Sequence, residues 1–151
     1  VYGPWGRPDM APMIFTKSIL ERSPIDVYNF GEMLRDFTYI DDVVECISLC
    51  SEKPLNLVNK SKSYCSNSIV QHQILNVGNG NPIKLMEFIN ILEEEIGIKA
   101  KINFKPMQKG DVTVTFASTN KMKNWVGYEP KVNIKKGIRL FIKWYLDYYP
   151  K

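Results

Sequence analysis

The sequence of 151 residues is poor in the side chains from which metal sites and disulfide frameworks are built. It has one histidine, His72, and three irregularly spaced cysteines, Cys46, Cys50 and Cys65. An odd number of cysteines without regular spacing argues against a disulfide framework, and a single histidine without a second cysteine pair argues against zinc. We therefore predict no metal site, interpret Cys46 and Cys50 as buried free thiols, and take His72 to be solvated rather than a catalytic base.

Long apolar runs and a strong charge of one sign are also missing. No run reaches the roughly 18 apolar residues that a membrane helix needs, and no signal peptide is recognisable. The net charge of +4 is too small to indicate nucleic acid, and the aromatic residues, 12% of the chain, follow no RNA-binding motif. These absences predict a cytoplasmic protein with neither a membrane nor a nucleic-acid partner.

Conventional catalytic motifs are absent as well. The sequence contains no Gly-x-Gly-x-x-Gly loop, no P-loop and no nucleophile elbow. The segment "GNGNP" (78–82) has closely spaced glycines, but it lacks the third glycine and the later acidic residue of a dinucleotide site. We interpret it as a tight turn, and we predict that this chain contributes no catalytic residue.

The remaining sequence is long enough for one domain with a hydrophobic core, and its apolar spacing predicts an α+β, helix-rich fold with short strands. The predicted helices cover 11–24, a stretch capped by Asp41 or Asp42 and ending near Cys50, a stretch from the Asn81 cap to Gly97, a short helix between the Ser118 cap and Gly127, and 134–149 after an Asn133 cap. The predicted strands are two runs in 25–42 around a turn at Asn29–Gly31, a run at 73–80 and one at 100–107. Residues 53–72, rich in Ser, Asn and Lys, are predicted to form a variable surface loop.

One helix is predicted in more detail, because its apolar residues recur at helical spacing. Leu85, Met86, Ile89, Leu92 and Ile96 form its apolar stripe, and Glu93 to Glu95 are expected to face water.

Two arginines stand on segments that glycine or proline constrains. Arg7 lies between Gly6 and Pro8, and Arg35 follows a glycine turn. The planar guanidinium fork matches carboxylate and phosphate oxygens, so each arginine is a candidate anion-binding residue. The alternative is a structural ion pair, for instance with Asp9 or Asp36.

Five segments in one order, "VYGPWGRPDMA", "IDVYNFGEMLRDFTYIDDVVE", "LNVGNGNPIKLMEFI", "PMQKGDV" and "GYEPKVNIKKGIRLFIKWY", resemble the C-terminal part of a known family. It is the NAD-dependent nucleotide-sugar epimerases and dehydratases, the extended short-chain dehydrogenases. "GRPDMA" and "RDFTYIDD" resemble most the branch of UDP-glucuronate 4-epimerases. The resemblance implies that 1–151 is the C-terminal sugar-nucleotide-binding portion, with 1–10 as the junction to an NAD-binding Rossmann domain that this chain lacks.

The resemblance also implies a division of roles. The family's Tyr-x-x-x-Lys pair and its glycine-rich NAD loop belong to the preceding half, so this chain alone is expected to be inactive. It would bind the UDP-sugar substrate and orient it for hydride transfer at C4 to NAD. Alternatives are the same portion of a UDP-glucuronate decarboxylase or a nucleotide-hexose 4,6-dehydratase, or a standalone UDP-sugar-binding or interaction module without chemistry.

Site residues follow from the same resemblance, position by position. Arg7 would meet the glucuronate carboxylate and Arg35 the pyrophosphate, while Asp111 would lie near the nucleotide. The remaining positions are Val27 and Tyr28 beside the uracil, Met10, Ala11 and Pro12 at the pocket mouth, where free helix N–H groups suit anions, Gln108, where galactose-type epimerases have a second arginine, and Val1 at the nicotinamide end. Ser118 stands where the family usually has an aspartate.

In the family, the segment "RDFTYI" and the helix after it pack on the nucleotide domain. We therefore expect Val43, Val44 and Ile47 to lack cover within this chain. Exposed apolar surface of this kind favours association, so a homo-oligomer is a further possibility.

Overall fold

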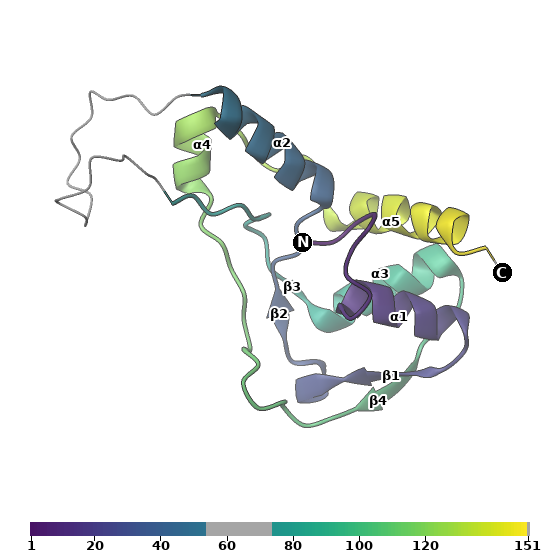
Figure 1. The fold of residues 1–151 in the computed structure, drawn as a ribbon. Helices are drawn as coiled ribbons and strands as arrows, with labels where there is room; N and C mark the ends of the chain where they lie inside the picture. Colours follow the sequence, from purple (N-terminus) through teal and green to yellow (C-terminus); the bar gives the residue numbers. More distant parts are fainter. Residues whose placement is uncertain (54–73, 151) are drawn as a thin grey trace.

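The computed structural model describes residues 1–53 and 74–150 and shows a helix-rich fold with a few short strands (Figure 1). This confirms the predicted α+β class. The elements in chain order are α1 (Ala11–Leu20), β1 (Pro24–Val27), the short 3-10 helix η1 (Tyr28–Gly31), β2 (Leu34–Arg35), α2 (Ile40–Glu52), β3 (Ile83–Lys84), α3 (Leu85–Ile96), β4 (Lys101–Phe104), α4 (Asn120–Val126) and α5 (Ile134–Tyr148).

The main core lies among α1, α3 and α5, together with β1. Its most deeply buried side chains include Phe88, Ile89 and Leu92 from α3 and Ile138 and Phe141 from α5. These residues recur every three or four positions, so each helix turns one apolar face inward. The predicted stripe on α3 is confirmed, with Phe88 and Ile91 as buried additions that extend it.

Two small sheets flank this core. Strand β1 pairs with β4 in parallel, with Ile25 opposite Ile102, and β2 pairs with β3 antiparallel, with Arg35 opposite Ile83. The 113–115 segment adds to β2, because the Leu34 amide donates to the Thr113 carbonyl and the Thr115 amide donates to the Leu34 carbonyl. These pairings bring residues 33–36 beside residues 111–115, about 76 positions further along the chain.

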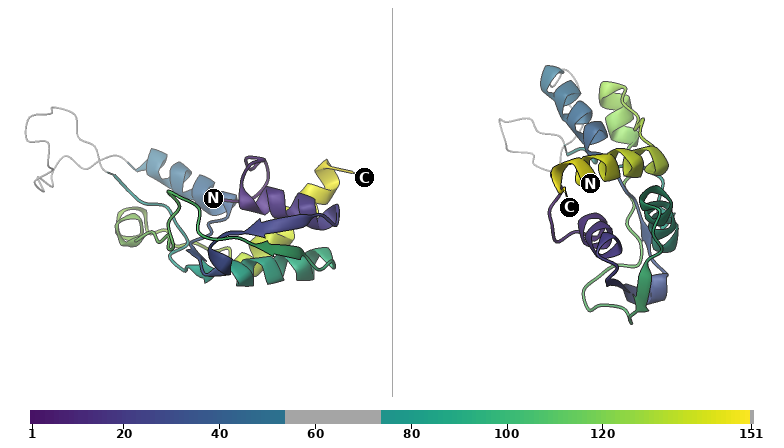
Figure 2. Two further views of the ribbon diagram at one scale, coloured as in Figure 1. Left: turned by 90° about the horizontal axis from the view of Figure 1, so that it is seen from below. Right: turned by 90° about the vertical axis from the view of Figure 1, so that its right-hand side faces the viewer.

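Helices α2 and α4 extend away from the layer of α1, α3 and α5, as Figure 2 shows. They share a second, smaller cluster of buried residues: Cys46, Met122 and Tyr128. The buried carboxylate of Asp42 connects α2 to the chain before α5, because it accepts hydrogen bonds from the Tyr128 hydroxyl (2.5 Å) and from the Lys131 and Val132 amides (3.0 and 3.2 Å). Cys46 and Cys50 are free thiols; Cys46 is buried, as predicted, but Cys50 is only partly buried.

Local end signals placed several helix ends correctly. Gly97 ends α3 and Gly127 ends α4, each in the left-handed conformation that glycine adopts without strain. Asn133 caps α5 by accepting a hydrogen bond from the Lys136 amide (2.9 Å). Pro12 lies in the first turn of α1, as predicted, but the helix ends at Leu20 and not at the predicted Pro24, which begins β1.

The predicted start of α3 at Asn81 is wrong. Residues Ile83 and Lys84 pair with β2 instead, and the Leu85 amide donates to the Met33 carbonyl, so the helix begins only at Leu85. Glu93, expected to face water, is buried because its carboxylate accepts hydrogen bonds from the Ala100 amide and the Lys99 ammonium.

Three further predictions are corrected. Residues 74–79 form no strand, because they pair with no other strand in the part of the chain that the structure describes. Neither Asp41 nor Asp42 caps α2, which begins after Tyr39 without a side-chain cap, since Asp42 is turned toward residues 128–132. Ser118 does not cap α4, whose preceding residue is Thr119.

On α2, Val44 and Ile47 are 56% and 62% exposed and lack cover, as expected, whereas Val43 is half-buried. Among the described helices, none has the length and apolar character needed to cross a membrane. The predicted loop at 53–72, with His72 and Cys65, lies almost wholly outside the described residues, which resume at Ile74.

Candidate functional site

Arg35 is held in place by acceptors from two segments. Its guanidinium donates to the Asp111 carboxylate (2.9 Å) and to the Leu34 and Thr113 carbonyls (3.1 and 3.2 Å). The Arg35 side chain is 19% exposed and the Asp111 side chain 37%. The pairing of β2 with the 113–115 segment creates this contact, so an arginine predicted from local sequence and an aspartate predicted from the resemblance are direct neighbours.

Asp111 is oriented by its own loop. Gly110 adopts a positive φ of 85°, and the Asp111 carboxylate also accepts a hydrogen bond from the Val112 amide (2.8 Å). This carboxylate on one terminal nitrogen and the two carbonyls on the other together fix the plane of the Arg35 guanidinium. The arrangement presents an ordered cation that can receive phosphate or carboxylate oxygens at its remaining exposed edge.

Asp36, the next residue, ties together two loops around this arginine. Its carboxylate accepts hydrogen bonds from the Gly80 (3.0 Å), Asn81 (3.3 Å) and Ala117 (3.3 Å) amides. The 78–82 segment bends at Gly80, where φ is 71°. Gly78 is required there because a Cβ would come 2.5 Å from the Ala117 Cβ. The sequence did not predict this role of Asp36. Its three amide donors lie 44 to 81 positions away, and the residues next to Asp36 do not indicate them.

The same contacts bear on cofactor binding. A dinucleotide phosphate would need the N–H groups of the glycine turn, but the Asp36 carboxylate already takes those of Gly80 and Asn81. The described residues therefore do not fit an NAD site at this turn. They also contain no group of three or more potential metal-ligating side chains.

Arg7 forms an ion pair with Asp9, at 2.6 Å, and both side chains are largely exposed. The hydrogen bond to Asp9 raises the pKa of Arg7, and the same bond lowers the pKa of Asp9. The structural ion pair considered as the alternative for the two arginines is found for Arg7, with Asp9, whereas Arg35 pairs with Asp111 and not with Asp36. An ion pair this exposed contributes little to stability, so an anionic ligand can displace Asp9 at small cost.

Met10 precedes α1, and Ala11 and Pro12 begin it, close in sequence to Arg7. Met10 is 43% exposed, while Pro12 is buried. The start of α1 has fewer free N–H groups than predicted. The Met13 and Ile14 amides both donate to the Met10 carbonyl, and Pro12 has no N–H.

The other candidate residues lie at differing depths. Val27 is fully buried in the core, so its side chain is closed to a ligand, and Tyr28 beside it is half-buried. The Lys105 amide donates to the Val27 carbonyl (2.9 Å), which holds this turn against the chain leading to Gln108. Gln108 and Val1 are exposed.

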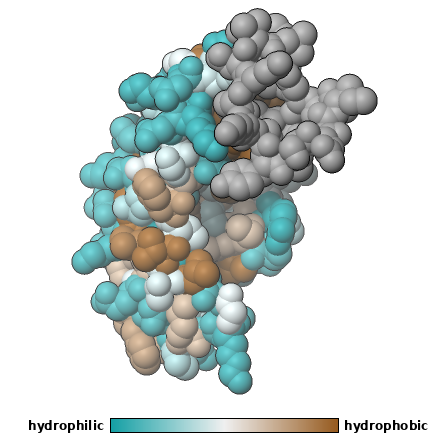
Figure 3. All heavy atoms as spheres, turned by 90° about the vertical axis from the view of Figure 1, so that its left-hand side faces the viewer, coloured by the Kyte–Doolittle hydropathy of each residue, from teal (hydrophilic) through white to brown (hydrophobic). Residues whose placement is uncertain are grey.

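The face that carries the 105–119 segment mixes hydrophobic and hydrophilic surface (Figure 3). Val112, Val114 and Phe116 are 53%, 50% and 64% exposed and alternate with Thr113 and Thr115. Their alternation follows from the pairing of this segment with β2, in which successive side chains point to opposite sides. The Thr115 hydroxyl accepts a hydrogen bond from the Asp36 amide (3.0 Å), so the polar side faces the arginine and aspartate cluster.

Together, these elements form a helix-rich lobe with an ordered arginine–aspartate pair, and the arginine is a candidate partner for phosphate or carboxylate oxygens. Residues 11–141 match the GDP-mannose 4,6 dehydratase family, and the chain belongs to this family of nucleotide-sugar epimerases and dehydratases.

Individual relatives agree with this assignment. The chain is 43% identical to Protein CapI of Staphylococcus aureus, covering 100% of this chain and 46% of the relative. It is 42% identical to a probable UDP-glucuronate 4-epimerase of Rhizobium meliloti, with 96% and 44% covered. The solved UDP-glucuronic acid 4-epimerase of Bacillus cereus, in complex with UDP-glucuronic acid and NAD, superposes with a TM-score of 0.83 at 28% identity, over 98% of this chain and 43% of that one. The chain thus spans less than half the length of these relatives.

Proposed function

We propose that the chain is the C-terminal, UDP-sugar-binding portion of an NAD-dependent UDP-glucuronate 4-epimerase. The observation that carries the proposal is the Arg35–Asp111 pair, an ordered cation beside residues from three segments, in a chain 42% identical to a probable UDP-glucuronate 4-epimerase. In this proposal residues 1–10 join the lobe to a preceding NAD-binding half, which supplies the catalytic tyrosine and lysine and most contacts to NAD.

Arg35 would bind the diphosphate of the sugar nucleotide. Asp111 and two carbonyls already fix the guanidinium, so little side-chain freedom remains to be lost on binding. Tyr28, from the adjacent η1, would border the uracil. Gln108, near Asp111 on the same loop, would contribute a neutral polar contact.

Arg7 would bind the carboxylate of the glucuronate, the group that distinguishes this substrate from UDP-glucose. Its guanidinium already holds a carboxylate, that of Asp9, in a two-point contact at 3.0 and 2.6 Å. The substrate carboxylate would replace Asp9 in the same geometry. Met10, Ala11 and Pro12 would line the mouth of this pocket, and Val1 would approach the nicotinamide end.

The test is Arg7→Ala in the full-length protein that joins this chain to its N-terminal half. We expect kcat/KM for UDP-glucuronate to fall by about tenfold or more, because the substrate carboxylate loses its charge-assisted hydrogen bonds to the guanidinium. UDP-glucose, which has no carboxylate, serves as the control substrate and should be converted equally by both proteins. An unchanged kcat/KM for UDP-glucuronate refutes the carboxylate assignment.

A second candidate of the same family is a dehydratase, to which the match to the GDP-mannose 4,6 dehydratase family points, or a decarboxylase. Product analysis of the full-length protein separates the three: an epimerase returns a UDP-hexuronate of unchanged mass, a decarboxylase releases carbon dioxide, and a dehydratase releases water.

A standalone binding module, the third candidate, would bind UDP-glucuronate with micromolar affinity as the 151-residue chain in calorimetry. A severed lobe would show no binding there.

A further inference from the structure

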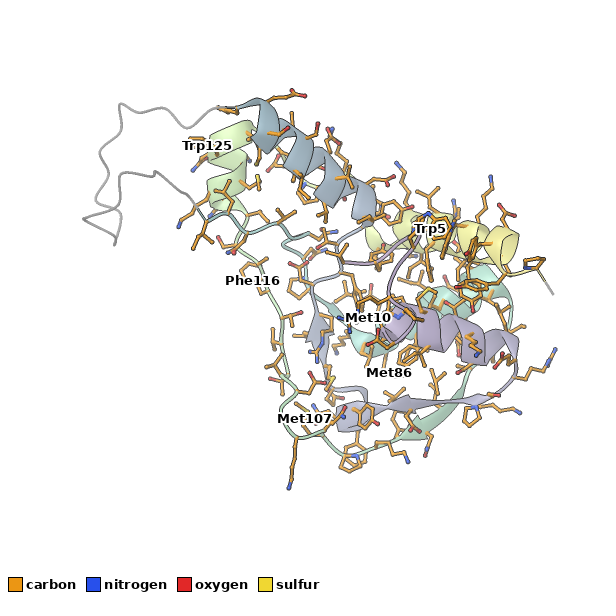
Figure 4. The ribbon with its side chains drawn as sticks, in the orientation of Figure 1. Trp5, Met10, Met86, Met107, Phe116 and Trp125 are labelled. Atoms are coloured by element: carbon orange, nitrogen blue, oxygen red, sulfur yellow. The ribbon has the colours of Figure 1, made fainter. Side chains whose placement is uncertain are left out.

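The loop that carries Arg7 contacts α5 at two places. At its start the Tyr2 backbone is fixed by hydrogen bonds with Thr38 and Ile40 (2.9 Å each), and the Tyr2 ring lies against Gly137. Three residues later the Trp5 ring packs against Trp144 and Tyr148, with ring centroids 5.6 and 4.7 Å apart. Figure 4 shows Trp5 above α5, far from Trp125 on α4.

The backbone at Trp5 has a conformation that tryptophan rarely adopts. The Gly6 amide donates to the Gly3 carbonyl (3.2 Å), which closes a four-residue turn with Pro4 at its second position and Trp5 at its third. Trp5 has a φ of 62°, and glycine or asparagine is the usual residue where a turn requires positive φ. Strain of this kind persists only where surrounding contacts impose it, and the contacts here are the two aromatic rings of α5.

Core packing does not explain the tryptophan. Trp5 is 72% exposed, and Tyr148 is 48% exposed. The pair therefore adds little to the buried interior, while it holds the turn down on the helix at a point two residues from Arg7. Gly6, between Trp5 and Arg7, has no side chain that could hold the backbone in place, and Pro8 restricts the backbone directly after Arg7.

We propose that Trp5, Trp144 and Tyr148 form an aromatic clasp that positions Arg7 toward the substrate carboxylate. The inference rests on the proposed function, in which Arg7 binds that carboxylate. Trp5 is then a positioning residue: it acts through Arg7, and it favours substrates that carry a carboxylate over those that do not.

The test uses the full-length protein and steady-state kinetics with UDP-glucuronate and UDP-glucose. Trp5→Ala should lower kcat/KM for UDP-glucuronate on the order of 10- to 100-fold, as expected when a binding group is displaced by about 1 Å, and leave UDP-glucose unchanged. Tyr148→Ala, which removes the other half of the clasp from an exposed position, should act in the same direction. Trp5→Phe should restore most of the loss, and Trp125→Ala, on distant α4, is the matched tryptophan control.

A double-mutant cycle separates the clasp from the proposed function. In an Arg7→Ala background, Trp5→Ala should cost less than twofold, because the residue through which it acts is gone. If Arg7→Ala itself leaves kcat/KM for UDP-glucuronate unchanged, the carboxylate assignment fails, and the positioning role of the clasp fails with it. If Arg7→Ala lowers kcat/KM but Trp5→Ala does not, or if Trp5→Ala costs the same with and without Arg7 or with both substrates, the clasp is refuted. Thermal unfolding of each variant identifies a variant that fails to fold, and Tyr148→Ala then decides.

Discussion

The Tyr2 ring packs against Gly137 in α5, and replacing this glycine by alanine tests the packing directly. Helix propensity alone predicts that Gly137→Ala stabilises the protein by about 1 kcal/mol. The added Cβ, however, would lie 1.9 Å from the Tyr2 Oη and 2.8 Å from the Tyr2 Cζ, and Tyr2 is only 4% exposed. Overpacking of a buried site costs about 1–3 kcal/mol, which outweighs or cancels the gain in helix propensity, so we expect a net destabilisation of up to about 2 kcal/mol.

Urea unfolding of the wild type, Gly137→Ala, Tyr2→Phe and the double variant measures this effect. Tyr2→Phe alone should cost less than about 1 kcal/mol, because the hydroxyl makes only a long hydrogen bond of 3.4 Å to the Ile134 carbonyl. In the double variant the nearest clashing atom is gone, so we expect a coupling of about 1 kcal/mol in the favourable direction. A Gly137→Ala protein that is more stable than the wild type would refute the close packing of Tyr2 on α5.

Two further predictions concern the small cluster between α2 and α4. Tyr128→Phe should destabilise the protein by about 1.5–3 kcal/mol in urea unfolding, because it removes a 2.5 Å hydrogen bond to the buried Asp42 carboxylate; a loss below 0.5 kcal/mol, about the error of such measurements, would contradict it. Burial raises the pKa of Cys46 to about 11 from an ordinary value of 9.0. The thiol therefore stays protonated to a higher pH in the folded state than in the unfolded state. Stability should therefore fall as pH rises from about 9 toward 11, and the fall should be shallower in Cys46→Ala; equal slopes would show that the thiol does not contribute.

Helix ends set by local chemistry were predictable from the sequence, and ends set by distant partners were not. Gly97 and Asn133 act on their own helix, so their roles can be read from neighbouring residues. Asn81 precedes a proline and has every local feature of a cap, yet Ile83 and Lys84 are drawn into a pairing with β2, some fifty positions earlier. Asp42 likewise looks like a cap and instead binds amides 89 and 90 positions away.

The candidate site divides in the same way. Arg35 was singled out because it follows a glycine turn, but its partner Asp111 is 76 positions away and came only from the resemblance. Asp36 escaped attention because all three of its amide donors are distant. The burial of Val27 agrees with its alternation with Asp26, which turns Ile25 and Val27 to the same inner face; its place beside the uracil came only from the resemblance.

The two arginines differ in how they are prepared for a ligand. Arg35 is mostly buried and fixed by acceptors from two segments, whereas Arg7 is exposed and held only by Asp9, two residues away. An ordered arginine suits the diphosphate, because every nucleotide sugar carries this group and a side chain already fixed in place loses little conformational freedom when it binds. A movable arginine suits the group that varies between substrates. Arg7 can then stay paired with Asp9 when no carboxylate is offered, and the proposed clasp at Trp5 confines its movement to the range that reaches the substrate.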